Sequence, residues 1–330
     1  MTGSYADTGE ARCSALPARP VTVVICAYTE ARWEQTQAAV GSVLSQSPAP
    51  EQVILVIDHN PELAERARGE AAGVTVLESE GLPGLSGARN TGLRKAGHPV
   101  TVFLDDDAEA RQGWLTSLTE PYADPRVIAT GGGIQPRWPR ARPAWMPPTF
   151  DWVIGCSYAG QPEVPSAVRN PIGANMSFRT DAALEAGGFD SGVGRVGSRP
   201  SGCEETELAI RLTSRNPGSV VWYVPAAVVD HHVDPARLTL RYFLRRCWHE
   251  GRSKAYVVTL AGASAGLESE RRHATAAIPA AALGDFRAAS RGDFPAFARI
   301  GAMLAGISAA ACGYLAGRSA ITGRRRQDVH

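Results

Sequence analysis

The sequence lacks several features that would point to particular classes of protein. Its 34 Lys and Arg residues nearly balance 33 Asp and Glu residues, so the net charge of +1 gives no general attraction to nucleic acid. None of the six cysteines belongs to a Cys-x-x-Cys pair, which argues against a zinc site or a disulfide framework and favours a reducing compartment. No internal repeat is visible along the chain.

Long hydrophobic runs are also scarce. Residues 1–20 contain no apolar segment, so we expect a disordered tail there and neither a signal peptide nor a membrane anchor. Residues 300–317 are uncharged and rich in Ala and Gly, and they just reach the length that spans a bilayer. Their weak hydrophobicity favours a buried or membrane-touching helix over a true span.

Short β-rich runs alternate with helical patterns in the first third of the chain. Residues 21–28, 53–57, 74–77 and 100–104 are β-rich, and helical patterns lie between them. This alternation predicts an α/β fold with a mostly parallel sheet and helices on both faces. Ligands of such sheets bind beyond the carboxyl ends of the strands. The polar residues at those ends are Tyr28, Thr29, Glu30, Asp58, His59, Asn60, Asp105, Asp106 and Asp107.

The second half contains a proline-rich segment, a glycine-rich segment and a helical end. Residues 137–148 are too rich in proline for regular structure, and residues 187–202 suggest a mobile loop that orders on a ligand. After Val233 the chain becomes alanine-rich and helical. We therefore expect a core domain over residues 21–235 and a helical C-terminal region over residues 236–330.

Three adjacent carboxylates, Asp105 to Asp107, follow the strand-like run at residues 100–104. Because adjacent carboxylates repel one another, they favour a hard divalent cation such as Mg²⁺ or Mn²⁺. Strand alternation directs Asp105 and Asp107 to one side and Asp106 to the other. The alternative interpretation is a solvated acidic turn.

Several segments together resemble the family 2 glycosyltransferases, which have the GT-A nucleotide-sugar fold. The resemblance covers about residues 20–255, and it rests on residues 23–28, 53–58, 87–93, 105–107, 173–179, 187–190 and 203–212. It implies a Rossmann-like catalytic domain over residues 21–235 that binds a nucleotide sugar. It also implies an inverting enzyme, in which one displacement transfers the sugar to an acceptor hydroxyl or amine.

For the donor, the resemblance implies that Asp58 reads the nucleobase. A carboxylate accepts N–H donors of uracil, thymine or guanine, so UDP, dTDP and GDP sugars all remain open. Arg89 and Asn90 correspond to a pair that lies against the diphosphate, where a guanidinium suits phosphate oxygens. The further donor contacts implied are Ala27, Tyr28, Glu30, Asp105, Asp106, Asn175 and Arg252.

For the metal, the resemblance implies Asp107 as the main ligand, with Asp105 towards the metal or the ribose. A late histidine completes the shell in many members, and either His231 or His232 matches it. The motif usually reads His, one variable residue, then Val, which favours His231. Mixed carboxylate and imidazole ligands make Mn²⁺ as plausible as Mg²⁺.

For the base, the resemblance points to the acidic pair Glu204 and Glu205, which opens an amphipathic helix. The second acid of this pair is usually Asp in the family, so Glu205 is a departure that lengthens the base by one methylene group. We expect Glu205 to act as general base and Glu204 to help place the acceptor or donor. Glu207 is the alternative candidate for the general base.

The basic helical stretch at residues 237–254 has two interpretations: it closes over the diphosphate, or it faces acidic lipid headgroups. The Gln-x-x-Arg-Trp signature of processive synthases is absent, so we expect the enzyme to transfer one sugar per encounter with its acceptor.

The composition suggests a bacterial protein, which we expect in the cytoplasm or at the inner face of the membrane. Its acceptor is a glycan, a lipid-linked sugar or a specialised metabolite, and Trp138, Trp145 and Trp152 either stack on it or pack against the sheet.

Two other function classes remain. A catalytically degenerate protein that binds a nucleotide sugar is supported by Glu205 in place of Asp. A metal-dependent phosphoester hydrolase would explain the acids, but it would leave the contexts of Arg89, Asn90 and the Glu204–Glu205 pair unexplained.

Overall fold

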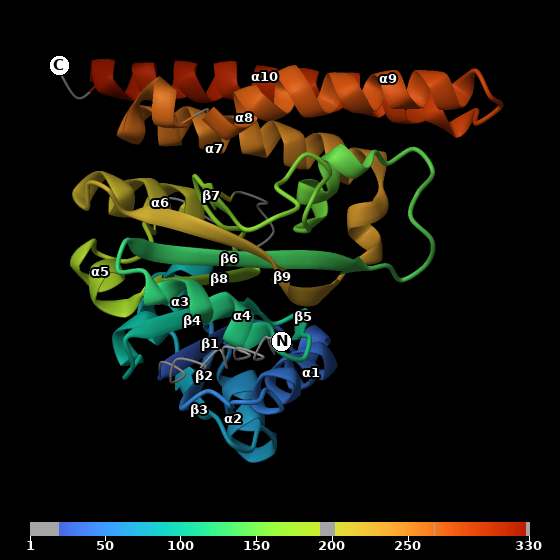
Figure 1. Ribbon diagram of the computed structural model, residues 1–330. Coiled ribbons are helices and arrows are strands. Elements are labelled where there is room, and N and C mark those ends of the chain that lie inside the picture. The colour runs from blue at the N-terminus through green and yellow to red at the C-terminus, as the bar shows by residue number, and fades with distance from the viewer. Residues whose placement is uncertain (1–19, 192–201, 267, 328–330) are drawn as a thin grey trace, which may run out of the picture.

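The structure is a computed structural model that describes residues 20–191, 202–266 and 268–327. The predicted N-terminal tail and most of the predicted mobile loop therefore lie outside the described residues. Figure 1 shows a central sheet with helices packed around it and a layer of long helices along one side.

The sheet has the strand order β3-β2-β1-β4-β8-β6-β9-β5, and β7 pairs with β9. Strands β1 to β4 are parallel and β6 is parallel to β9, whereas β8, β5 and β7 run antiparallel to their neighbours. The predicted α/β fold is confirmed, and its sheet is mixed beyond β4. The strands are β1 (Val21–Ala27), β2 (Gln52–Ile57), β3 (Thr75–Glu78), β4 (Val100–Asp105), β5 (Ala108–Ala110), β6 (Val127–Arg137), β7 (Ser166–Val168), β8 (Asn175–Arg179) and β9 (Val220–His232).

Helices cover both faces of the sheet, because its central strands are apolar on both sides. Residues of β1 and β2 are almost all buried, which is typical of parallel strands that face two layers of helices. One hydrophobic cluster joins the sheet to α1 (Trp33–Leu44), α2 (Pro61–Glu70) and α4 (Trp114–Thr119). A second joins it to α3 (Leu85–Lys95), α5 (Thr180–Glu185) and α6 (Glu204–Arg215).

The C-terminal region is helical, as predicted. It contains α7 (Leu240–Gly266), α8 (Glu268–Arg272), a π-helical turn (His273–Ala277), α9 (Ile278–Ala289) and α10 (Pro295–Gln327). In Figure 1, α7 lies between the sheet domain and the outer layer of α9 and α10. Phe150, in the 3₁₀ segment Pro148–Ile154, packs with Phe243 of α7 and Met303 of α10 in a third hydrophobic cluster.

Helices α7 and α10 pack closely because glycines lie between them. A Cβ atom added to Gly251 would lie 1.9 Å from the carbonyl oxygen of Ala310, and one added to Gly313 would lie 2.1 Å from that of Trp248. No side chain can be inserted at either point without separating the backbones. The backbones of the two helices are therefore in direct contact at these points.

We expect Gly251→Ala to destabilise the protein by about 1–3 kcal/mol, because the new methyl group forces α7 and α10 apart. Gly41→Ala is the matched control, since Gly41 lies in α1 with no atom within 4 Å of the added Cβ. That change should be neutral or stabilising by up to about 1 kcal/mol. Urea unfolding of both variants measures the difference, and equal stabilities would contradict the packing described.

Candidate functional site

An acidic cluster forms where β4 ends and β5 pairs with β9. The antiparallel register places Ala108 opposite His231, and the backbone N–H of His232 donates to the carbonyl of Asp107 at 2.8 Å. This pairing brings His231 to the acids that follow β4. Its Nε2 lies 3.2 Å from Oδ1 of Asp107, and both side chains are buried.

Asp105, Asp107 and His231 each offer one ligand atom, and these atoms lie within 4.8 Å of one another. Two oxygens and one imidazole nitrogen suit Mn²⁺ or Mg²⁺, whose ligand atoms lie about 2.0–2.2 Å from the ion. Donors on opposite sides of such an ion are then about 4.4 Å apart, so the three residues fit one metal ion. Asp106 is not in this group, but the predicted strand alternation is not the reason. Asp106 and Asp107 lie in the turn after β4, and Arg32 contacts both.

The structure does not bring His232 to this cluster. Its Nε2 lies 2.8 Å from Glu109 Oε1 and 3.3 Å from Arg137, because consecutive residues of β9 point to opposite faces. Of the two histidines that the sequence left open, only His231 is placed to bind the metal.

Two arginines that the sequence analysis missed lie against the acids. Arg32 is 3.0 Å from Asp107 and 3.3 Å from Asp106, and Arg237 is 3.7 Å from Asp107. Burial opposes ionisation of Asp107, but His231, Arg237 and Arg32 outweigh it and hold its pKa well below the usual range. Burial and then the neighbouring Asp107 raise the pKa of Asp106. Asp107 is therefore the carboxylate that stays charged.

Arg89 of α3 connects the acidic cluster to α6. Its guanidinium is buried and donates to Glu204 at 2.8 Å, to Asp105 at 3.1 Å and to the carbonyl of Gly173 at 2.9 Å. The ring of Phe189 lies 5.5 Å from its central carbon. The N–H groups of the Arg89 guanidinium therefore donate to protein oxygens. Its positive charge is paired with the carboxylates of Asp105 and Glu204.

The two acids that open α6 differ in their surroundings. Glu204 is 5% exposed and bound to Arg89, whereas Glu205 is partly exposed and forms no ion pair with the residues that the structure describes. Burial, and then the neighbouring Glu204, raise the pKa of Glu205 to about 8. A helix start favours carboxylates in general. Glu205 is partly exposed and its raised pKa suits a proton acceptor, whereas Glu204 is buried in its ion pair with Arg89.

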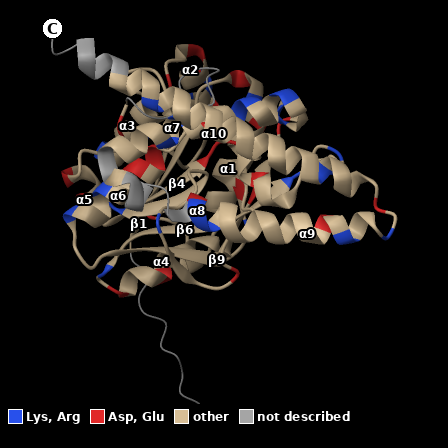
Figure 2. Ribbon diagram, turned by 90° about the horizontal axis from the view of Figure 1, so that it is seen from above, with Lys and Arg blue, Asp and Glu red and all other residues tan. Residues whose placement is uncertain are grey.

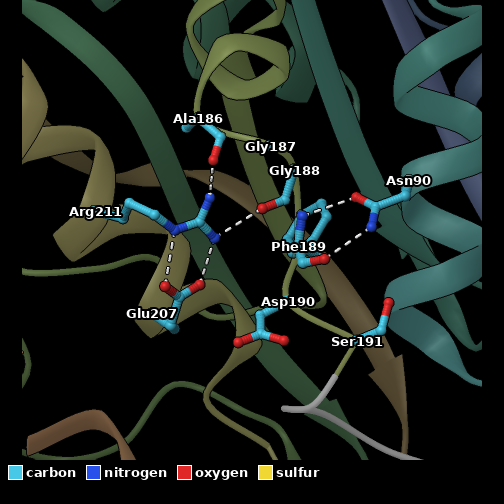
Figure 3. A pocket seen from close by; sticks show the side chains of 9 residues that line it. All are labelled: Asn90, Ala186, Gly187, Gly188, Phe189, Asp190, Ser191, Glu207 and Arg211. Atoms are coloured by element: carbon cyan, nitrogen blue, oxygen red, sulfur yellow. Dashed lines mark hydrogen bonds and ion pairs between the residues drawn. The ribbon is translucent and has the colours of Figure 1, made fainter. Parts of the chain in front are cut away.

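Asn90 and Glu207, both candidate site residues, have positioning contacts instead (Figure 3). The Asn90 amide pairs with the backbone N–H and carbonyl of Phe189 at 2.7 and 2.8 Å. Glu207 forms an ion pair with Arg211, which donates to the carbonyls of Ala186 and Gly188. Together they hold the turn in which Gly187 and Gly188 have positive φ values, next to an open pocket of about 430 Å³.

The other predicted donor residues lie at the ends of β1 and β2. Asp58 accepts the backbone N–H of Gly84 at 2.9 Å and lies 2.8 Å from His59 Nδ1, and its side chain is 15% exposed. Tyr28 is 48% exposed, Glu30 is exposed, and Ala27 is buried. Asp58 and Tyr28 are therefore accessible at the sheet edge where the nucleotide was expected.

The remaining predicted donor residues are Asn175 and Arg252. Asn175 is fully buried, where its amide accepts from Trp114 Nε1 and donates to the carbonyls of Gly133 and Ala227. It fixes the strands of the sheet. Arg252 has an exposed side chain, and its backbone packs against Gly317 of α10.

Comparisons with known proteins show the family to which the chain belongs. The family described as glycosyl transferase family 2 matches residues 22–186. A glucosyl-dolichyl phosphate glucuronosyltransferase from Haloferax volcanii is 32% identical over 71% of this chain and 76% of its own length.

Two solved structures share the fold. A mannosyltransferase from Pyrobaculum calidifontis in complex with GDP-Man and Mn²⁺ is 20% identical, with a TM-score of 0.57 over 90% of this chain and 87% of that one. The structure of GalNAc-T7 with UDP, GalNAc and Mn²⁺ is 18% identical, with a TM-score of 0.53 over 78% of this chain and 55% of that one.

Half of the chain matches the family, and a relative 32% identical covers more than two thirds of it, so this protein belongs to the family 2 glycosyltransferases and has their GT-A fold.

Proposed function

We propose that this glycosyltransferase is metal-dependent and inverting, and that it moves one sugar from a nucleoside diphosphate sugar to a hydroxyl or amine of its acceptor. The observation that carries the proposal is the linkage of Asp105 through Arg89 to Glu204, since it places a metal-ligand cluster beside an acidic helix start.

Asp105, Asp107 and His231 are the residues that would hold Mn²⁺ or Mg²⁺. When bound there, the ion supplies positive charge that stabilises the departing diphosphate. The nucleoside would lie at the ends of β1 and β2, with Asp58 accepting an N–H of the base and Tyr28 beside it. UDP, dTDP and GDP donors all satisfy this contact.

Glu205 would act as the general base. As its carboxylate takes the acceptor proton, the acceptor oxygen or nitrogen forms a bond to the anomeric carbon and the bond to the diphosphate breaks on the opposite face. This single displacement inverts the anomeric centre. A base with a raised pKa is a stronger proton acceptor, and its partial burial supports this role.

For the acceptor, we infer a lipid-linked sugar at the cytoplasmic face of a membrane. The name of the Haloferax relative, which contains a dolichyl phosphate sugar, supports this choice over a free metabolite. A dinuclear hydrolase is not favoured, because the described part of the chain contains one group of His, Cys, Asp and Glu residues close enough for a metal.

We expect His231→Ala to abolish the stabilisation of the protein by Mn²⁺ together with UDP, dTDP or GDP, because the cluster loses its nitrogen ligand. His232→Ala is the matched control and should keep this stabilisation, since His232 contacts Glu109 instead. Thermal-shift measurements compare the melting temperature of each variant with and without Mn²⁺ and nucleotide. Loss in His232→Ala alone would contradict the proposed ligand set.

We expect Glu205→Gln to lower kcat by about 10²–10⁴-fold while nucleotide binding is unchanged, because the variant cannot accept a proton. Glu205→Asp should recover part of the activity. Glu163→Gln, which changes an exposed acid, is the control. A fully active Glu205→Gln enzyme, with activity lost in Glu207→Gln, would assign the base to Glu207.

The pH dependence of kcat/KM provides a separate check. Glu205 accepts a proton only when ionised, and its pKa is raised to about 8. Activity should therefore rise with pH, increase tenfold per unit well below pH 8 and level off above it. A profile that is flat between about pH 6 and about pH 9 would show that no group with this pKa is required.

A further inference from the structure

The outer face of α10 is apolar, and no other described part of the chain covers it. The stretch Pro295–Thr322 has a mean hydropathy of 1.6 over its most apolar window, yet only 28% of that window is buried. No charged residue occurs between Arg299 and Arg318. A helix of this composition inside a soluble core would be mostly buried, so the exposed apolar face needs another explanation.

The large apolar side chains of α10 form one stripe. Phe297, Leu304 and Leu315 are 55%, 63% and 64% exposed. Their spacings of seven and eleven residues are close to whole numbers of helical turns, so they point in the same direction. The opposite side of the helix carries Gly313 and Gly317, which pack against α7.

The turn that joins α9 to α10 adds further exposed apolar side chains. Leu283 and Phe286 are 50% and 60% exposed on α9, and Phe294 is 73% exposed just before α10. Arg287 and Arg291 are also exposed here. Seen from above, α9 and α10 lie over the rest of the described molecule, and α10 is largely free of charged residues (Figure 2).

Positive charge is concentrated in the same region. Residues 271–330 contain nine Arg and three Asp, which gives this stretch a net charge of +6. The net charge of the whole chain is +1, so residues 1–270 carry a net charge of −5. Two of those acids, Asp285 and Asp293, are both 2.7 Å from Arg299. Arg287, Arg291 and Arg318 are exposed and flank the apolar stripe, so positive charge predominates beside it.

We propose that the α9–α10 layer docks in the plane of an anionic lipid bilayer surface. The stripe and the phenylalanines of the α9–α10 turn enter the boundary between headgroups and acyl chains, and the flanking arginines bind lipid phosphates. Helix α10 lies on the bilayer and does not cross it, because its inner side is locked against α7 by the glycine contacts. A second copy of the chain is a poorer occupant, since it would present the same positive charge.

Flotation of the full-length purified protein with vesicles tests this docking. We expect binding to phosphatidylcholine vesicles that contain phosphatidylglycerol, weaker binding at high salt, and little binding to pure phosphatidylcholine. Phe294→Ser/Phe297→Ser should weaken binding about tenfold or more, because two aromatic side chains no longer insert. Leu82→Ser/Val164→Ser is the matched control, as Leu82 and Val164 are 72% and 65% exposed on other parts of the surface.

Circular dichroism verifies that both double variants are folded. The proposal is overturned if the wild-type protein does not bind anionic vesicles at low salt, or if both variants lose binding equally. Light scattering that shows a dimer, lost in Phe294→Ser/Phe297→Ser, would instead assign the face to self-association. Resistance of the bound protein to alkaline extraction would instead indicate a membrane-spanning helix.

Discussion

The candidate site is held together by the two ion pairs of the buried Arg89 guanidinium. It joins three separate parts of the chain: α3, which carries it, Asp105 at the end of β4, and Glu204 at the start of α6. A buried ion pair that loses one partner leaves an uncompensated charge, at a typical cost of about 3–5 kcal/mol. Arg89 therefore fixes the distance between the metal-ligand cluster and the acidic helix start, which the proposed displacement requires.

A second constraint comes from strand pairing. The short antiparallel pair of β5 and β9 sets Asp107 beside His231, and alternation along β9 then turns His232 away. His231, Arg237 and Arg32 together hold the pKa of Asp107 well below its usual range, so this carboxylate is ionised, as a metal ligand must be. The site is thus assembled from backbone register and buried charge together.

Much of this arrangement could be predicted from the sequence. Sequence patterns predicted the apolar strands, the Asp cluster and the family motifs, because each of these consists of consecutive residues. The C-terminal helices were also predicted, because alanine-rich stretches favour helix formation. The mixed strand directions beyond β4 could not be predicted, because strand direction depends on pairings between segments that are distant in the sequence. The contacts of Asn90 and Asn175, which were predicted to bind the donor, could not be predicted either: their amides pair with the backbone of Phe189 and with Trp114, Gly133 and Ala227. Such roles follow from tertiary contacts, as do those of Arg32 and Arg237.

We propose that Asp105, Asp107 and His231 hold the metal that binds the donor diphosphate. Crystals grown with Mn²⁺ and UDP, dTDP or GDP allow a direct test, because anomalous scattering locates manganese. We expect a manganese peak ligated by Asp107 and His231, with diphosphate oxygens on the same ion and Asp105 beside it. A peak at other residues, or a bound nucleotide diphosphate with no metal between it and Asp107, would contradict it.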